Sequence, residues 1–228
     1  MKPINPPQSL MELTAERIRE AIIRGELPLG SKLSEQLLAD RLDVSRSPVR
    51  EALALLQIEG LVRVLPKRGT FVFTPDQKVV EDLCDHRAVL EAACLMMALE
   101  RNPKPLLGGM RQGFEEMKQA IAANDSAAYA SGDMRFHRSI VEFSDNQSIA
   151  RTYRSTIGPL MALRSHLFTA LQAQVERSMA EHAALLEACE ARDIQGAREI
   201  VAEHIGHLAE HYRDTRMESP VTKLRRVR

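Results

Sequence analysis

The chain of 228 residues has no tryptophan, few other aromatic residues and only three cysteines. An odd number of cysteines without Cys-x-x-Cys spacing argues against a disulfide framework and against a thiolate zinc site. The amino-terminal stretch lacks the apolar core of a signal peptide, and no apolar run reaches the roughly 18 residues of a membrane span. We therefore expect a cytoplasmic protein without membrane contact.

The chain also lacks a net charge, so charge alone does not indicate a nucleic-acid partner, although the basic excess lies at its two ends. Apolar residues make up 44% of the sequence and charged residues 27%, which is typical of a helix-rich globular protein. The length allows two ordinary domains. We expect the boundary after residue 75, where β-prone segments give way to long helical ones.

Residues 1–75 have the pattern of a winged helix-turn-helix. Apolar spacing predicts a helix from residue 9 to 24, and Ser34 is suited to cap a second one that ends at residue 42. Asp43 suits the turn that follows, because Asp tolerates left-handed backbone conformations better than most residues. In the next segment a buried stripe is expected at Val49, Ala52, Leu53 and Leu56.

Arg46 and Arg50 are four residues apart, so they share a helix face that points away from this stripe. Ser45 or Ser47 can cap that helix. In a helix-turn-helix the second helix reads the major groove with its amino-terminal residues. Two arginines on an isolated helix usually mark a solvated surface, but cap, turn, helix and basic hairpin in succession favour DNA binding.

A basic hairpin is predicted directly after this helix. Two β-prone runs, at 61–65 and 70–73, bracket Pro66, Lys67, Arg68 and Gly69. Gly69 suits a turn position with positive φ, and the two basic side chains can reach a groove or phosphates. We interpret this hairpin as a wing.

Residues 76–216 are predicted to form an all-α antiparallel bundle. The basic segment 217–228 has no periodicity and is predicted to be a disordered tail. The fold class is therefore mainly α, with a winged helix-turn-helix followed by a helical bundle. The expected bundle helices lie at about 79–97, 107–121, 126–144, 147–173, 176–191 and 194–214.

Four polar residues fall at inward positions of the bundle. Asp133 and His137 are four apart on one helix, and His182 and His204 interrupt apolar stripes on two later helices. Buried polar groups without partners are costly, and one metal ion would satisfy all four. The spacing leaves open the alternative of separate core histidines with ordinary hydrogen bonds.

Both halves resemble the GntR family of bacterial transcription regulators, in its FadR-like branch with an FCD-type effector domain. The first half does so through "LSEQLLADRLDVSRSPVREALALLQIEGLV" and "LPKRGTFV", and the second through "DHRAVLEAACLMMA", "DMRFHRSI", "EHAALLEA" and "AREIVAEHIGHL". The chain differs at Asp43, where the family usually has Gly, and at Gln36, where some relatives have an Arg. The resemblance implies DNA contacts from Ser45, Arg46, Ser47 and Arg50, and from Arg68 and Gly69 of the wing.

The resemblance also implies a divalent metal, zinc or nickel, bound by Asp133, His137, His182 and His204. Arg87 matches a position that often helps to hold an effector carboxylate in this family. The alternative role for Arg87 is a surface ion pair with Glu91. The implied function is a homodimeric, ligand-responsive repressor of a near-palindromic operator in double-stranded DNA, with a small carboxylate as effector.

A metal-dependent hydrolase on a His-rich bundle is the alternative function, since a bound metal can activate water. The chain lacks the HExxH motif and the His-Asp dipeptide of helical phosphohydrolases, and no carboxylate is evidently free to act as a general base. We therefore expect a protein that is not an enzyme.

Overall fold

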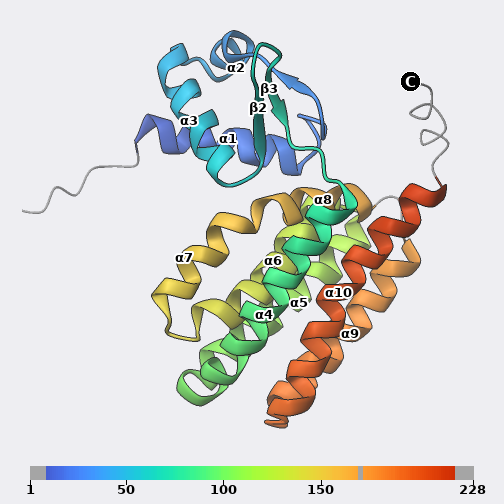
Figure 1. Cartoon of the computed structure of the whole chain (residues 1–228). Coiled ribbons are helices and arrows are strands. Elements are labelled where there is room, and N and C mark those ends of the chain that lie inside the picture. Colours follow the sequence, from blue (N-terminus) through green and yellow to red (C-terminus); the bar gives the residue numbers. More distant parts are fainter. Residues whose placement is uncertain (1–8, 169–171, 219–228) are drawn as a thin grey trace, which may run out of the picture. The chain divides into compact units, whose positions relative to one another are not determined.

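The computed structural model describes residues 9–168 and 172–218 (Figure 1). Contacts between its residues divide the chain into two compact units. The first contains the chain up to Thr74 together with Ser155–Leu163, and the second contains Pro75–Arg154 and the chain from Arg164 onward. No helix among the described residues is both long enough and apolar enough to cross a membrane.

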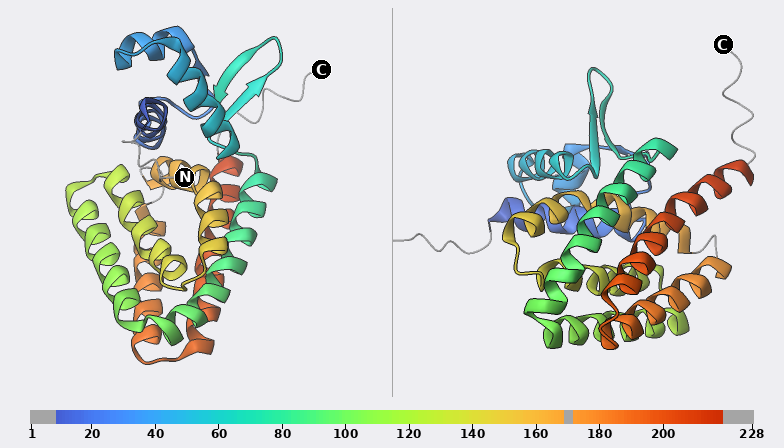
Figure 2. Two further views of the ribbon diagram at one scale, coloured as in Figure 1. Left: turned by 90° about the vertical axis from the view of Figure 1, so that its left-hand side faces the viewer. Right: turned by 60° about the horizontal axis from the view of Figure 1, so that its bottom comes forward.

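The first unit contains a winged helix-turn-helix. Its elements are α1 (Leu10–Ile23), β1 (Lys32–Leu33), α2 (Glu35–Leu42), α3 (Arg46–Ile58), β2 (Val62–Leu65) and β3 (Gly69–Val72). The strands form an antiparallel sheet in the order β1-β3-β2, with Leu65 paired to Gly69 at the tip. Figure 2 shows the β2–β3 hairpin extending beyond the helices of this unit. Strand β1 was not predicted, because two residues are too few to show a period.

The polar residues between the helices adopt the predicted roles. The Ser34 hydroxyl accepts a hydrogen bond from the Leu37 amide at 3.3 Å and so caps α2. Asp43 ends α2 in the left-handed conformation, with φ 52° and ψ 47°. This single left-handed residue turns the chain from α2 into α3.

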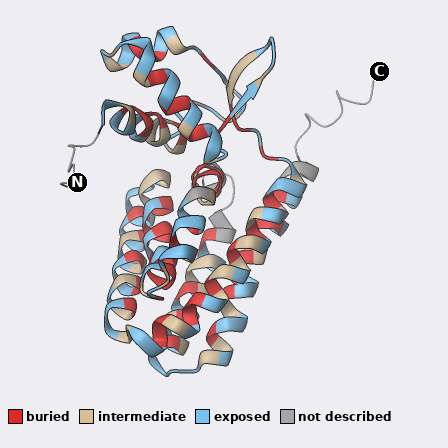
Figure 3. Ribbon diagram, turned by 60° about the vertical axis from the view of Figure 1, so that its left-hand side comes forward, coloured by how far each residue is buried: buried red, intermediate tan, exposed pale blue. Residues whose placement is uncertain are grey.

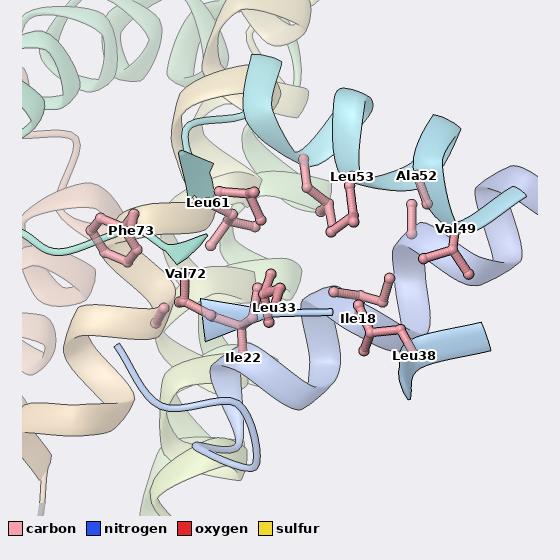
Figure 4. Packing of buried hydrophobic residues seen from close by; sticks show 14 of the residues in the cluster. Ile18, Ile22, Leu33, Leu38, Val49, Ala52, Leu53, Leu61, Val72 and Phe73 are labelled. Atoms are coloured by element: carbon pink, nitrogen blue, oxygen red, sulfur yellow. The ribbon is translucent and has the colours of Figure 1, made fainter. Parts of the chain in front are cut away.

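The core of this unit is formed mainly by aliphatic side chains from all three helices and from the sheet, together with Phe73 (Figure 4). The predicted stripe of α3 is fully enclosed, with Val49, Ala52 and Leu56 at 0% exposure and Leu53 at 4%. Each large aliphatic side chain so enclosed contributes roughly 1.5–3 kcal/mol. The apolar face of α3 is therefore held in the core, and its opposite face remains outside.

The second unit is a helical bundle, with the predicted stop after α4 at Asn102. Its helices are α4 (Gln77–Arg101), α5 (Pro103–Ala123), α6 (Ser126–Glu142), α7 (Gln147–Thr156), α8 (Gly158–Phe168), α9 (Gln172–Glu190) and α10 (Ile194–Glu218), of which α7 and α8 share residues with the first unit. Helix α4 lies beside α10 (Figure 2). Buried residues face inward along the bundle helices (Figure 3).

The prediction of one helix over 147–173 was wrong, because the chain forms two helices that meet at Ile157. Pro159 lacks an amide hydrogen and disfavours helical backbone in the residue before it, so it belongs in the first turn of a new helix. Residues 169–171 and the part of the predicted tail from residue 219 lie outside the described residues.

Helices α5 and α6 approach each other closely at two glycines. A Cβ atom on Gly113 would lie 2.6 Å from the Phe136 amide nitrogen and 2.7 Å from the Gly132 carbonyl oxygen. A Cβ on Gly132 would lie 2.9 Å from the Met117 amide nitrogen. No larger residue fits at either position without moving a backbone, so these glycines set the helix spacing next to Asp133.

Candidate metal centre and nucleic-acid interface

The structure brings together the four polar residues that the sequence placed on inward helix faces. Asp133 and His137 come from α6, His182 from α9 and His204 from α10. All four are buried, and one potential ligand atom from each lies within 4.8 Å of the others. The His182 and His204 side chains occupy the interior positions predicted from the apolar stripes around them.

The three imidazole rings point their Nε2 atoms at one another. The His137 Nε2 lies 3.0 Å from the His182 Nε2 and 3.1 Å from the His204 Nε2. One carboxylate oxygen of Asp133 lies 3.2 Å from the His182 Nε2 and 3.7 Å from the His137 Nε2. Three nitrogens and one oxygen thus converge on one small region of the interior.

Each ring also directs its other nitrogen, Nδ1, at a hydrogen-bond acceptor. The pairs are His137 with Glu91 Oε2 at 2.6 Å, His182 with the Ser178 carbonyl oxygen at 2.7 Å, and His204 with Glu181 Oε2 at 2.8 Å. An acceptor at Nδ1 requires the proton there, which leaves the Nε2 lone pair free. Such outer partners commonly orient and strengthen histidines that bind a metal.

These tautomers leave three Nε2 lone pairs facing each other, which is unfavourable unless a proton or a cation lies between them. A proton would make one ring an imidazolium. Burial, together with the positive charge of Arg87, lowers the pKa of His137 from 6.5 to about 4, so the ring is neutral near pH 7. A divalent cation between the rings would satisfy all three lone pairs, and three imidazoles with a carboxylate form a donor set suited to zinc or nickel.

Arg87 and Glu91 form the ion pair that the sequence left open, but the pair is buried and not at the surface. The Arg87 Nε lies 2.6 Å from Glu91 Oε1, and the two side chains are 3% and 0% exposed. Tyr153 donates a hydrogen bond to the same Glu91 oxygen at 2.7 Å. Burial alone would raise the pKa of Glu91, but Arg87 and His137 lower it to about 2. The Arg87 Nη2 atom is buried without a hydrogen-bond partner.

A second arginine, Arg164, whose side chain is 11% exposed, contacts the opposite side of the cluster. The Arg164 Nη2 lies 2.8 Å from Asp133 Oδ1 and donates to the Ser178 hydroxyl at 2.6 Å. Tyr129 donates to that hydroxyl at 3.2 Å. Burial would raise the pKa of Asp133, but the charge of Arg164 lowers it well below its usual range. The acid is therefore ionised and held in place.

Sequence reasoning missed Glu91, Arg164 and Glu181 as parts of this cluster. Glu91 lies four residues after Arg87, and Arg164 interrupts an apolar run, so both had a detectable signal. Among the other histidines, His166 is exposed, whereas the His207 Nδ1 lies 2.8 Å from the Glu181 carboxylate that also contacts His204.

At the other end of the chain, α3 presents the predicted DNA-reading residues at the surface. Ser45 occupies the N-cap position without a side-chain cap bond. The Ser47 hydroxyl donates to Glu51 at 3.1 Å. The Arg46 and Arg50 side chains are 56% and 66% exposed. These guanidinium groups are accessible to a partner and are not part of the core.

Both arginines contact the same glutamate, which the sequence analysis did not single out. Glu35 Oε2 lies 3.0 Å from the Arg46 Nη2 and 3.0 Å from the Arg50 Nη2. The Arg50 Nε also donates to Glu35 Oε1 at 3.4 Å. We refer to these three residues as the Glu35 cluster.

The predicted wing is a tight hairpin with a basic tip. Gly69 has φ 113°, as its turn position requires, and Lys67 also has a positive φ of 63°. The Arg68 amide donates to the Leu65 carbonyl at 3.0 Å, and the Arg68 side chain is exposed. A Cβ on Gly69 would lie 3.0 Å from the Lys32 side chain, so β1 adds a basic residue beside the wing that the sequence analysis missed.

Two family models match the chain, and together they cover most of it. The model described as "Bacterial regulatory proteins, gntR family" matches residues 10–72, and the one described as "FCD domain" matches residues 82–207. The first match contains the Glu35 cluster and the wing. The second contains Asp133, His137, His182 and His204.

Curated relatives and solved structures agree with these matches. The Uxu operon transcriptional regulator of Escherichia coli is 28% identical over 226 residues, which is 90% of this chain and 87% of that protein. The gluconate operon transcriptional repressor of Bacillus subtilis is 31% identical over 147 residues, 64% and 60% of the two chains. The solved structure of E. coli McbR/YncC matches with a TM-score of 0.79 and 22% sequence identity, and the match covers 92% of this chain and 100% of that one. This likeness supports the fold. The domains and relatives are those of transcription regulators, so the hydrolase alternative is not retained.

Proposed function

Because the chain belongs to the GntR family of bacterial regulatory proteins and carries an FCD domain, we propose that it is a ligand-responsive transcriptional repressor. It binds a near-palindromic operator in double-stranded DNA as a homodimer, and a small organic acid is sensed at a divalent metal in the FCD domain. The convergence of three Nε2 lone pairs and the Asp133 carboxylate carries the sensing part of this proposal. The names of relatives such as the gluconate operon repressor support the sign of regulation.

The exposed face of α3 supports the DNA-binding role. Arg46 and Arg50 offer planar donor forks for guanine edges or phosphates, and Ser45 and Ser47 offer donors for phosphates. Arg68 and Gly69 add a basic side chain and a close backbone approach at the wing tip. Unlike Arg87 and Arg164, the α3 arginines have solvent on most of their surface and can exchange it for DNA.

The FCD cluster supports the sensing role. Asp133, His137, His182 and His204 would hold zinc or nickel, and the bound ion would supply further coordination positions for a carboxylate. Arg87 has an unpaired, buried Nη2 donor, which a carboxylate can satisfy. This polar lining suits a small acid better than a long acyl chain.

Two considerations support a homodimer. A near-palindromic operator mirrors a two-fold protein, with one winged helix for each half-site. Helix α4 also exposes Val89 and Met96, 69% and 41% exposed and seven residues apart on one helix face, which is suited to contact with a second copy. An effector that prefers one arrangement of the dimer would change DNA affinity by a coupling of about 1–3 kcal/mol.

A thermal-shift screen of carboxylates tests the sensing part. Chelator-treated protein is mixed with zinc or nickel and with a panel of small acids. A metal at about 100 times its Kd should stabilise the fold by about 2.7 kcal/mol, and a cognate acid should add stability only when metal is present. His182→Ala should bind less metal by elemental analysis, whereas the exposed histidine variant His166→Ala should bind as much as wild type. Equal metal content in His182→Ala would remove His182 from the ligand set.

Fluorescence anisotropy with DNA from upstream of its own gene tests the DNA-binding part. We expect saturable binding that excess unrelated DNA does not compete away, and a lower affinity when the acid found in the screen is added. Binding that unrelated DNA abolishes at equal concentration would contradict the repressor proposal.

A further inference from the structure

We infer that Glu35 sets the DNA specificity of the recognition helix by orienting Arg46 and Arg50 and by cancelling one of their two charges. This inference rests on the proposed DNA-binding function and adds a residue that itself carries the wrong charge to bind DNA. In DNA recognition by α3, Glu35 is thus a positioning residue, since it acts through the two arginines.

Glu35 belongs to a different helix from the two arginines that it contacts. It lies in the first turn of α2, directly after the Ser34 cap, and reaches across to α3, 11 residues away from Arg46 and 15 from Arg50. Its side chain is 28% exposed, about half as exposed as either arginine. The contact therefore joins the two helices of the helix-turn-helix and is not a local pair within one helix.

The hydrogen bonds of Glu35 orient both guanidinium groups. Glu35 accepts from the Nε and Nη2 atoms of Arg50 and from the Nη2 atom of Arg46. Each guanidinium has five N–H donors, so both arginines keep donors that can reach a base edge. A long side chain held in one conformation before binding loses less freedom when it meets the DNA, and its fork meets only bases at the matching position.

Glu35 also reduces the positive charge that α3 presents. One carboxylate between two guanidinium groups leaves the cluster with a single net positive charge. Hydrogen bonds from Arg50 and then Arg46 lower the pKa of Glu35, so this carboxylate is ionised at neutral pH. Attraction to phosphates is independent of sequence and grows with the number of positive charges. A glutamate at this place weakens binding to every DNA and so raises the share that base contacts contribute.

The experiment uses full-length Glu35→Gln, which keeps the shape of the side chain and removes its charge. The probes are a 30-base-pair duplex selected from random DNA with the wild-type protein, and a shuffled duplex of the same composition. We expect Glu35→Gln to bind the shuffled duplex several-fold more tightly with a steeper salt dependence. The ratio of selected to shuffled affinity should fall about 10-fold.

The matched control is Glu20→Gln, which removes the same charge from α1 of the same unit, where Glu20 contacts Arg17 at the surface. It should keep the wild-type ratio. Glu35→Asp retains the charge and should restore the weak binding to shuffled DNA. If Glu35→Asp binds shuffled DNA as tightly as Glu35→Gln does, the charge argument is wrong.

A series of single base-pair changes in the selected duplex separates positioning from general damage to the fold. Glu35→Gln should reduce the discrimination only at base pairs where Arg46→Ala or Arg50→Ala also reduces it. An unchanged ratio and profile would overturn the role of Glu35. A wild-type protein that enriches no sequence at all would instead overturn the proposed DNA-binding function.

Discussion

Among the arginine–glutamate contacts of the described residues, those made by Glu35 and by Glu91 differ in almost everything except the residue types. In the first unit Glu35 contacts Arg46 and Arg50, whose side chains are more than half exposed. In the second unit Glu91 contacts Arg87, and both are almost completely buried. Within the described residues, the partly exposed Glu35 carboxylate contacts arginines, whereas the buried Glu91 carboxylate also contacts Tyr153 and His137.

This difference shows that the environment, and not the residue pair, determines what such a contact does. An exposed ion pair contributes about 0–1 kcal/mol, because water solvates both charges well, and its members can be given up to a partner. A buried pair has lost that solvation, so removal of one member leaves the other charge unpaired in the interior. The first kind is suited to recognition at a surface, and the second to a fixed interior site.

The largest expected effect is the loss of stability when Glu91 is removed from the buried pair. Glu91→Ala should lower the free energy of unfolding by about 3–5 kcal/mol, because Arg87 would remain charged and buried without its partner. Glu35→Ala should change it by less than about 1 kcal/mol. Urea denaturation of both variants with chelator present gives the two values. Similar losses in the two variants would mean that burial does not separate the two pairs.

The pH dependence of stability tests the buried environment of His137, which contacts Glu91. The pKa of His137 is lowered from 6.5 to about 4 in the folded chain, so the unfolded state binds the proton more readily between these values. The contribution of this ring is complete above pH 6.5 and is lost as the pH falls through about 4. Urea midpoints of chelator-treated protein should therefore decrease over this window, and less steeply in His137→Asn. Parallel pH profiles would contradict a neutral, buried His137.

The substitution Arg50→Ala tests the role of the exposed α3 arginines in DNA binding. If Arg50 makes a bidentate base contact, this change should weaken operator binding by about 5- to 150-fold. The fold should be unaffected, because the side chain lies outside the core. Anisotropy titrations measure the dissociation constant, and thermal melting checks the fold. An unchanged dissociation constant would remove Arg50 from the readout.

The smallest effect concerns the turn that brings α2 and α3 together. Asp43 is exposed and left-handed, so its substitution tests the backbone alone. Asp43→Ala should lower stability by about 1 kcal/mol, because alanine tolerates this conformation less well. Asp43→Gly should stay within about 0.5 kcal/mol of wild type, since glycine gains backbone ease but also unfolded-state freedom. Equal urea midpoints for the two variants would show that this turn carries no strain.

Features that depend on local spacing were predictable from the sequence. The α3 stripe, the Ser34 cap, the Asp43 turn and the hairpin around Gly69 each follow from residues that are close in the chain. The inward positions of His182 and His204 also follow from helical periodicity. These predictions succeeded because a helix or hairpin imposes its period on nearby residues whatever the rest of the fold does.

Features that depend on contacts between distant residues were not predictable. The approach of Glu35 to Arg50, of Glu91 to His137 and of Arg164 to Asp133 joins different helices. Periodicity gives the face of a helix but not the helix that packs against it. The alternative of a surface Arg87–Glu91 ion pair put the pair in the wrong environment for the same reason, since a spacing of four residues on α4 does not show which helices cover it.

The glycine crossing between α5 and α6 has a consequence for how an acid could be sensed. Because the backbones of α5 and α6 approach closely at Gly113 and Gly132, we expect α6 to keep its position against α5, and with it Asp133 and His137. His182 and His204 lie on the other side of the cluster, on α9 and α10. We expect any ligand-driven displacement to occur in those later helices, so the signal would begin at the carboxyl-terminal end of the bundle.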